Sequence, residues 1–289
     1  MPEHFIRAAA LLPGPLRARA AALPEETRGR CEELRLRLGC APTLRLPEGE
    51  RQLAPEPVDA GTIAAVLETA TGASLHAVAD ELRRGYVCAP GGVRVGVCGT
   101  AVCTREGIGT IRDVSSLCIR VARPVPGAGR ELLPRLEGKS VLIVSPPGGG
   151  KTTLLRELVR AQSDRGVRVA LADERGELAG MHGGAAGFDV GRCTDVLTGA
   201  PKAEAALLLL RAAAPEVVAM DEISAPADAA AVETLTGCGV RILATAHAAD
   251  LDTLLRRPVF RRVLGRGAFD VLVRISGRGR ARRYTAQAL

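Results

Sequence analysis

The stretch "SPPGGGKTT", residues 145–153, restricts the fold of this 289-residue chain more than any other part of it. Two prolines and three glycines stand between an apolar run, "VLIV", and a run with helical spacing, "LLRELVRAQ". A strand that passes through a glycine-rich turn into a helix directs several backbone N–H groups at one point. The start of the helix adds a partial positive charge at the same point. The stretch therefore predicts an anion-binding loop in an α/β domain.

The residues of this loop have separate expected roles in holding ATP. Glycine is needed at three successive positions because a Cβ would block both the turn and the approach of a phosphate. Lys151 is expected to reach the β- and γ-phosphates, and Thr152 is expected to ligate Mg²⁺. The usual pattern is G-x-x-x-x-G-K-[ST], and Ser145 replaces its first glycine. A turn that binds nothing is the alternative. The predicted nucleotide-contacting residues are Ser145, Pro146, Pro147, Gly148, Gly149, Gly150, Lys151, Thr152 and Thr153.

Acidic and histidine side chains follow three further apolar runs. "PEVVAMDEIS" ends a predicted strand with Asp221, expected to hold Mg²⁺ through water, and Glu222, expected to orient or deprotonate the attacking water. "VALADERGELAG" and "ILATAH" place Glu174 and His247 at the ends of two other predicted strands. The carboxyl ends of parallel strands meet at one edge of a sheet. Glu174 and His247 are therefore candidates to face the γ-phosphate, with a solvated turn and a capping histidine as the alternatives.

Arg192 lies in "GRCTDVLTG", which we interpret as a loop rich in small residues. Two interpretations remain open from the residues themselves. The guanidinium pairs with Asp195, or it reaches a nucleotide held by the same subunit or by a neighbouring one.

Composition shifts at residues 123–139, where three prolines and three glycines indicate a linker. Before it, alternating runs predict a hairpin over 34–46 and a small antiparallel sheet, and Asp59 and Ser74 are predicted to cap two helices. After it, apolar runs alternate with helices predicted over 152–162, 201–213 and 226–236. That alternation predicts a parallel sheet covered by helices on both faces. We therefore predict an α+β N-terminal domain over 1–125, a linker over 126–139 and a P-loop domain over 140–289.

Composition excludes several other classes of function. The formal charge of +7, from 39 basic and 32 acidic residues, favours acidic partners without choosing among them. Four Phe, two Tyr and no Trp argue against a surface that stacks single-stranded bases. The eight cysteines form no C-x-x-C pair, which favours reduced thiols in the cytosol over a zinc site. The longest apolar run, 205–210, is too short to span a bilayer, and prolines interrupt the N-terminal apolar patch, so no signal peptide is expected.

Read in order, eight blocks of the chain resemble the stage III sporulation AA family, ATPases of endospore-forming bacteria. The resemblance covers about residues 31–250, and the family's loop resembles "SPPG-x-GKTT", so Ser145 fits it. The blocks are "EELRLRLGCAP", "ELRRGYVCAPGGVRVGVCGTAV", "IRDVSSLCIRVAR", "SPPGGGKTTLLREL", "DERGELAG", "GRCTDVLTGAPKAEA", "PEVVAMDEI" and "ATAHA". One departure is "EISAPADAAAVE", which has fewer charges around Asp228 than the family pattern and leaves a polar contact there in doubt.

That family is similar to the ATPases of type II, type IV and pilus systems, whose four motifs correspond here to 145–153, 173–177, 216–222 and 245–247. The resemblance implies a RecA-like ATPase domain, a hexameric ring with nucleotide between subunits, and a mobile N-terminal domain. It also implies that Glu174, beside Glu222, is a candidate catalytic or metal-orienting acid. It further supports His247 as a candidate site residue. It places the protein in the mother-cell cytoplasm, peripheral at the membrane.

Three hypotheses of function follow. The first is an oligomeric, Mg²⁺-dependent ATPase that powers assembly of, or transport through, the channel between mother cell and forespore, with the channel's membrane proteins as partners. The second is a single-stranded nucleic-acid-binding P-loop ATPase, like related plastid and cyanobacterial proteins that carry an added binding domain; we expect no room for one after "RISGRGRARRYTAQAL". We therefore expect no nucleic-acid partner, although the tail arginines Arg278, Arg280, Arg282 and Arg283 suit phosphates. The third is a scaffold that uses nucleotide to hold its shape.

Overall fold

The computed structural model describes residues 2–72, 79–105, 107–122, 125, 127–277 and 282–289. The chain divides into two compact units. The first comprises Met1–Arg123 and Gly180–Gly187, and the second comprises Pro124–Ala179 and Phe188–Leu289. The chain therefore leaves the second unit after residue 179, contributes eight residues to the first unit, and returns at residue 188.

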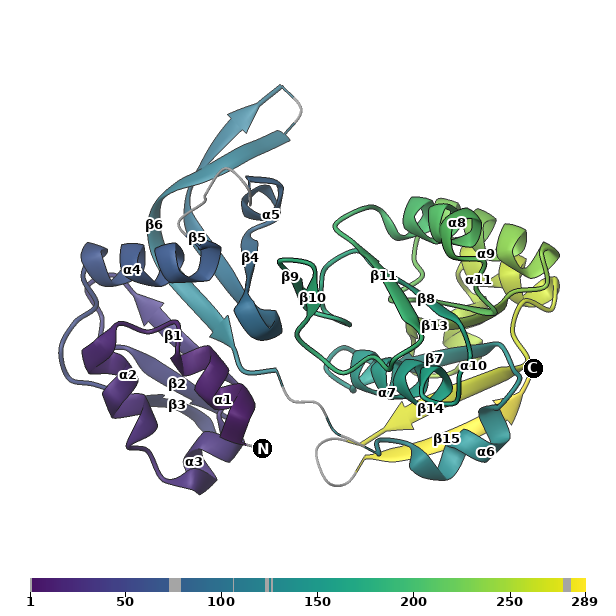
Figure 1. The fold of residues 1–289 in the computed structure, drawn as a ribbon, viewed down its shortest axis with the longest axis horizontal. Helices are drawn as coiled ribbons and strands as arrows, with labels where there is room; N and C mark the ends of the chain where they lie inside the picture. Colours follow the sequence, from purple (N-terminus) through teal and green to yellow (C-terminus); the bar gives the residue numbers. More distant parts are fainter. Residues whose placement is uncertain (1, 73–78, 106, 123–124, 126, 278–281) are drawn as a thin grey trace. The chain divides into compact units, whose positions relative to one another are not determined.

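In the described part of the first unit, six strands form an antiparallel sheet in the order β3-β2-β1-β6-β5-β4 (Figure 1). The strands are β1 (Glu33–Arg37), β2 (Thr43–Leu46), β3 (Gly49–Gln52), β4 (Tyr86–Ala89), β5 (Val93–Thr104) and β6 (Gly107–Arg120). The helices are α1 (Pro2–Ala9), α2 (Gly14–Ala21), α3 (Glu25–Arg30), α4 (Ala60–Thr71) and α5 (Ala79–Arg83). The predicted hairpin over 34–46 is confirmed as β1 paired with β2.

Alternating side chains explain how this sheet packs. Leu34 and Leu36 of β1 and Leu44 of β2 are fully buried, and they lie in one core with Phe5 of α1 and Val66 of α4. Asp59 accepts a hydrogen bond from the amide of Thr62 at 2.7 Å, so the predicted cap of α4 is confirmed. The cap predicted at Ser74 lies outside the described residues.

The segment Gly180–Gly187, which the predicted bounds assign to the P-loop domain, forms a short hairpin, β9 (Met181–His182) with β10 (Ala185–Ala186), that belongs to the first unit. The Nη1 atom of Arg7 donates to the Gly187 carbonyl at 2.9 Å, and Nδ1 of His182 contacts the Cys88 carbonyl at 3.1 Å. A Cβ on Gly187 would collide with the backbone of Gly92. Glycine is therefore required where these two backbones meet.

In the described part of the second unit, seven strands form a sheet in the order β11-β8-β12-β13-β7-β14-β15. Every neighbouring pair is parallel except β14 and β15, which are antiparallel. The strands are β7 (Val141–Ser145), β8 (Val169–Asp173), β11 (Thr194–Thr198), β12 (Val217–Met220), β13 (Arg241–His247), β14 (Val271–Ser276) and β15 (Arg283–Ala288). The helices are α6 (Leu133–Leu136), α7 (Lys151–Ser163), α8 (Lys202–Ala213), α9 (Pro226–Gly237), α10 (Leu251–Leu255) and α11 (Pro258–Gly265).

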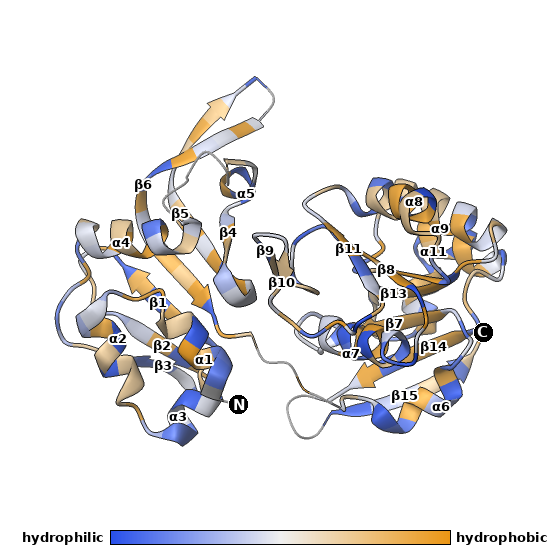
Figure 2. Ribbon diagram, in the orientation of Figure 1, coloured by the Kyte–Doolittle hydropathy of each residue, from blue (hydrophilic) through white to orange (hydrophobic). Residues whose placement is uncertain are grey.

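Helices cover both faces of this sheet, as predicted. Figure 1 shows α8, α9 and α11 on one face and α7 on the other. Leu209 of α8, Val232 of α9 and Phe260 of α11 are buried in one core with strand residues such as Leu142. Figure 2 shows the central strands as strongly hydrophobic, which is typical of a parallel sheet buried on both faces.

Three segments differ from the sequence-based expectation. The segment read as a small-residue loop includes the edge strand β11, which pairs in parallel with β8. The strands β14 and β15 extend the sheet beyond β7 and were not predicted. The expected linker includes α6, and Leu132 and Leu136 within it are buried. The division at 125 and 139 as functional domains stays a prediction.

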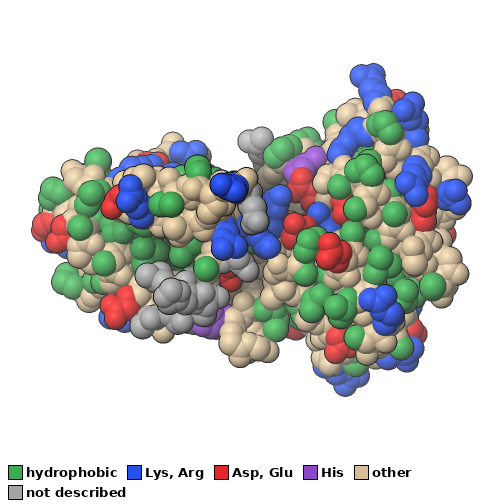
Figure 3. All heavy atoms as spheres, turned by 90° about the horizontal axis from the view of Figure 1, so that it is seen from above, with side chains coloured by type: hydrophobic (Ala, Val, Ile, Leu, Met, Phe, Trp, Pro, Cys, Tyr) green, Lys and Arg blue, Asp and Glu red, His purple; other side chains and the backbone are tan. Residues whose placement is uncertain are grey.

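The surface mixes both signs of charge. Figure 3 shows basic and acidic side chains interspersed over one face, with hydrophobic side chains scattered among them. Of the helices in the described ranges, none combines the length and the apolar character that crossing a bilayer requires.

Candidate functional site

The glycine-rich loop follows β7 directly and leads into α7. Gly148 and Gly150 have φ values of 73° and 98°, in the left-handed region that favours glycine. Gly149 is required for a different reason, because a Cβ there would collide with the Ser145 hydroxyl. Ser145 is fully buried, and its hydroxyl donates to the Pro146 carbonyl at 2.9 Å. Ser145 is the last residue of β7, where the backbone needs no left-handed φ and glycine is therefore not required. Its side chain lies against Gly149 of the loop.

Lys151 begins a chain of contacts across the edge of the sheet. It is buried, and its Nζ lies 3.3 Å from the Ser145 carbonyl and 2.8 Å from Nδ1 of His247. The other ring nitrogen of His247, Nε2, lies 3.1 Å from Oε1 of Glu222. Because an ammonium group only donates, Nδ1 accepts from Lys151, which assigns the hydrogen to Nε2 and directs it at Glu222. Burial lowers the pKa of Lys151, opposed by the charges of Asp221 and Glu222.

Thr152 and Asp221 meet at the start of α7. The Thr152 hydroxyl donates to Oδ2 of Asp221 at 3.0 Å, and the Thr245 hydroxyl of β13 donates to Oδ1. A hydroxyl and a carboxylate oxygen side by side suit Mg²⁺, which prefers oxygen ligands and retains waters. The residues present therefore fit the predicted metal, for which Thr152 and Asp221 would be the protein contacts.

Thr245 also fixes the backbone of the acidic turn. Glu222 has a φ of 46°, which is uncommon for a residue with a side chain. The amide of Glu222 donates to the Thr245 hydroxyl at 2.8 Å, and the amide of Ile223 donates to the Thr245 carbonyl at 2.8 Å. These bonds hold a strained turn that directs the Glu222 carboxylate towards His247. Sequence reasoning gave Thr245 no role of its own.

The second acidic segment is anchored to α7. Asp173 is buried and accepts hydrogen bonds from the amides of Glu177, Leu178 and Ala179 at 2.8–3.2 Å. Burial raises the pKa of Asp173, opposed by these backbone bonds. Arg156 of α7 donates to the carbonyls of Leu178 and Glu177, each at 2.6 Å, and burial lowers its pKa to about 10. Asp173 and Arg156 therefore shape the loop that presents Glu174.

Glu174 lines one hollow together with Glu222. The hollow is lined by Ala172, Asp173, Glu174, Arg175, Glu177, Lys202, Asp221, Glu222 and Ser224. Lys202, at the start of α8, pairs with Glu174 at 2.9 Å. Burial raises the pKa of Glu174, but the hydrogen bond and charge of Lys202 outweigh burial and lower it. Sequence reasoning missed Lys202, because nothing in its local pattern separates it from a solvated helix start.

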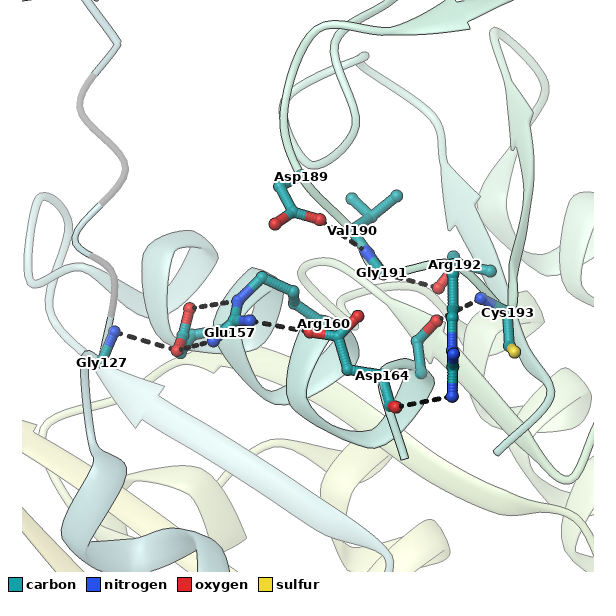
Figure 4. A network of polar contacts seen from close by, with 11 residues as sticks. Gly127, Glu157, Arg160, Asp164, Asp189, Val190, Gly191, Arg192 and Cys193 are labelled. Atoms are coloured by element: carbon teal, nitrogen blue, oxygen red, sulfur yellow. Dashed lines mark hydrogen bonds and ion pairs between the residues drawn. The ribbon is translucent and has the colours of Figure 1, made fainter. Parts of the chain in front are cut away.

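Arg192 is not at this site within its own subunit, which corrects one of its two predicted roles. It precedes β11, and the amino end of β11 lies at the edge opposite the phosphate loop. Figure 4 shows Arg192 beside the far end of α7, where its Nη2 lies 3.3 Å from the Asp164 carbonyl. The contact is with this carbonyl rather than with Asp195. A role towards the nucleotide of a neighbouring subunit stays a proposal.

Asp228 makes the polar contacts that the sequence left in doubt. It is buried in the first turn of α9, where its Oδ2 accepts from the amides of Ser224 and Ala225, both at 2.9 Å. The same oxygen lies 3.9 Å from Nζ of Lys202. Asp228 thus closes the turn after Glu222.

Comparison with known proteins agrees with this arrangement. The sequence profile of the family described as "Sporulation stage III, protein AA" matches residues 16–284. Stage III sporulation protein AA of Bacillus subtilis (strain 168) is 33% identical over 276 residues, which are 93% of this chain and 90% of that protein.

Solved structures share the fold at low identity. The pilus retraction motor PilT with bound ADP superposes with a TM-score of 0.64 at 15% identity, over 91% of this chain and 81% of that one. The Legionella pneumophila ATPase DotB superposes with a TM-score of 0.59 at 14% identity, over 89% of this chain and 75% of that one. The predicted fold class, an α/β P-loop ATPase fold of the secretion type, is therefore confirmed. The match along nearly the whole sequence shows that this chain belongs to the family of stage III sporulation protein AA.

Proposed function

We propose that the protein is a Mg²⁺-dependent ATPase of the secretion type. The observation that supports this most is the convergence of three strand ends on the start of α7. Lys151, Thr152 and Asp221 meet there, and Glu222 is linked to Lys151 through His247. A scaffold that only held nucleotide would have no need for the strained Glu222.

The geometry supports distinct roles for these residues. The loop amides and Lys151 hold the β- and γ-phosphates, where the lowered pKa of the ammonium rises again as an anion binds. Thr152 and Asp221 hold Mg²⁺, which neutralises the charge that develops on the phosphate oxygens. Glu222 accepts a proton from the attacking water or orients it. His247 contacts both Lys151 and Glu222, so it couples the departure of the γ-phosphate from Lys151 to the position of Glu222. Glu174 lies across the same hollow as a second candidate acid.

Family membership supports the wider part of the proposal. The protein works as an oligomer, proposed to be a hexamer, in the mother-cell cytoplasm at the membrane. It powers assembly of, or transport through, the channel between mother cell and forespore, whose membrane proteins are its partners. The Bacillus subtilis relative carries the sporulation name, and PilT and DotB are a motor and an ATPase of the same fold.

The direct test is phosphate release from Mg-ATP by the purified full chain. We expect Lys151→Ala to lower kcat/KM by about 100-fold or more, because the buried ammonium group that contacts the transferred phosphate is lost. We expect Glu222→Gln to stop turnover while ATP still binds, because the amide cannot take up a proton. Glu216→Gln is the matched control: Glu216 lies at the opposite end of β12, paired with the exposed Arg168.

Three results would contradict the proposal. They are no binding of Mg-ATP by the folded, assembled wild type, full activity in both site variants, and equal losses in Glu216→Gln. Hydrolysis that depends on added single-stranded DNA would instead favour the nucleic-acid-binding alternative.

A further inference from the structure

The sheet order places the start of β15 beside the phosphate loop. β7 and β14 are parallel neighbours, with Arg274 opposite Val144, so both strands end at the same edge. β15 is antiparallel to β14, with Arg283 opposite Ser276, so β15 begins where β14 ends. Arg282 immediately precedes β15. The backbone of Arg282 therefore lies two strand spacings, about 10 Å, from β7 and the loop that follows it. An arginine side chain can largely cover that distance.

The side chain of Arg282 lies against the phosphate loop itself. A Cβ on Gly150 would lie 2.7 Å from Cζ of Arg282 and 2.9 Å from each of its terminal nitrogens. Gly150 is the residue before Lys151 and has a φ of 98°. Glycine at this position therefore serves two purposes: it permits the turn, and it leaves room for a guanidinium group.

This placement gathers positive groups at one point of the loop, which suits the binding of an anion. Gly150 is the N-cap residue of α7, a 13-residue helix whose first amides carry a partial positive charge. Lys151 adds a second positive group at the same place, and Arg282 adds a third. The Nε atom of Arg282 is buried and, within the described ranges, has no hydrogen-bond partner. Charged donors arranged in this way are suited to a phosphate, which accepts from a guanidinium in a bidentate manner.

We propose that Arg282 is a nucleotide-binding residue of its own subunit, whose guanidinium contacts the phosphate chain of ATP or ADP in the loop. This inference rests on the proposed function, and it gives the C-terminal strand a part in the site. It also separates Arg282 from a general role of the basic tail in nucleic-acid binding.

The test is calorimetric titration of Mg-ADP into the full-length protein at several salt concentrations. We expect Arg282→Ala to raise the Kd about tenfold or more, because a charge-assisted hydrogen bond to phosphate is lost. The dependence of Kd on salt should also become weaker, which a loss of packing alone would not produce. Arg283→Ala is the matched control, because Arg283 is the next residue along and is exposed. Arg282→Gln keeps much of the side-chain volume and serves if the alanine variant unfolds.

The outcomes separate this inference from the function on which it rests. If the wild type binds Mg-ADP and Arg282→Ala or Arg282→Gln binds it equally well, this inference is overturned and the proposed function stands. An equal loss in Arg283→Ala, or a loss with unchanged salt dependence, also overturns it. If the wild type binds neither Mg-ADP nor Mg-ATP, the proposed function fails and takes the inference with it.

Discussion

Helix α7 carries charged residues at both ends, and the two ends satisfy those charges differently. At the far end, the Glu157 carboxylate accepts from Arg160 at 2.6 and 3.1 Å and from the Gly127 amide at 2.9 Å, and Arg160 also bonds to Asp164 at 2.8 Å (Figure 4). At the first turn, Lys151 lies against a carbonyl and a histidine ring instead of a carboxylate.

This difference distinguishes a structural network from a binding site on one element. At the far end of α7, Arg160 has carboxylate partners in both Glu157 and Asp164. The first turn collects positive groups whose natural partner is an anion from outside. Mutations at the two ends should therefore separate stability from activity.

Lys151→Met should give the largest effect on activity, and it should not lower the stability of the fold. Hydrolysis should fall by about 100-fold or more. The nucleotide-free variant should melt at the same temperature as the wild type or higher, because burial of the charged ammonium disfavours the fold. Phosphate release and calorimetric melting measure the two quantities. A clear fall in melting temperature would contradict this description of the first turn.

Glu157→Gln should reverse that pattern. The variant leaves Arg160 and the Gly127 amide without a carboxylate in a largely buried place, which should cost about 2 kcal/mol of unfolding free energy. The rate of hydrolysis at a temperature where the variant is folded should be unchanged. Chemical denaturation measures the first effect. Loss of activity in the fully folded variant would show that the far end takes part in catalysis.

Both ends should favour the folded state more as the pH rises, but in different pH ranges. Burial raises the pKa of Glu157, but Arg160 and the Gly127 amide outweigh it, so the folded-state pKa lies below the ordinary 4.5. Its stabilisation is therefore present above pH 4.5 and lost as the pH falls through the lowered value. The pKa of Lys151 lies below the ordinary 10.5, so its cost is full below the folded-state pKa and is relieved as the pH rises towards 10.5.

Differences between variants isolate these pH effects. The stability gap between the wild type and Glu157→Gln should close as the pH falls below 4.5. The wild type should gain stability relative to Lys151→Met as the pH rises towards 10.5. Denaturation curves over this range check both signs, and a gap that stays constant with pH would contradict the assigned cause.

Arg192→Ala should give the smallest effect on the isolated subunit. Its contact is a single 3.3 Å hydrogen bond from an exposed side chain, so the loss of stability should be about 0.5 kcal/mol or less. The Kd for Mg-ADP should stay within about twofold of the wild type. A fall in hydrolysis that appears only when subunits assemble would support the proposed role towards a neighbouring nucleotide.

Much of the second unit was predictable because local pattern and motif agreed. The strands that end at Ser145 and Met220, and the helices after them, follow from short sequence windows. The parallel arrangement then brings Lys151, Asp221 and His247 to one edge, as the strand-end argument predicted.

The rest depended on contacts between residues far apart in the chain. Arg282 is more than 130 residues beyond Gly150, and the two meet because the sheet continues past β7. Lys202 meets Glu174 through the sheet order rather than through any pattern around it. The alternative in which Arg192 reaches the nucleotide of its own subunit was wrong, because its segment leads into a parallel strand that begins at the edge opposite the phosphate loop.

The hairpin Gly180–Gly187 has a consequence for how the gene can be divided. The polypeptide passes from one unit to the other three times, so a cut at residue 123 leaves this hairpin on the C-terminal fragment. Its docking groups, Arg7 and the Cys88 carbonyl, would remain on the N-terminal fragment. Two such fragments produced together should therefore co-purify, and replacing Gly187 with a bulkier residue should release them from each other.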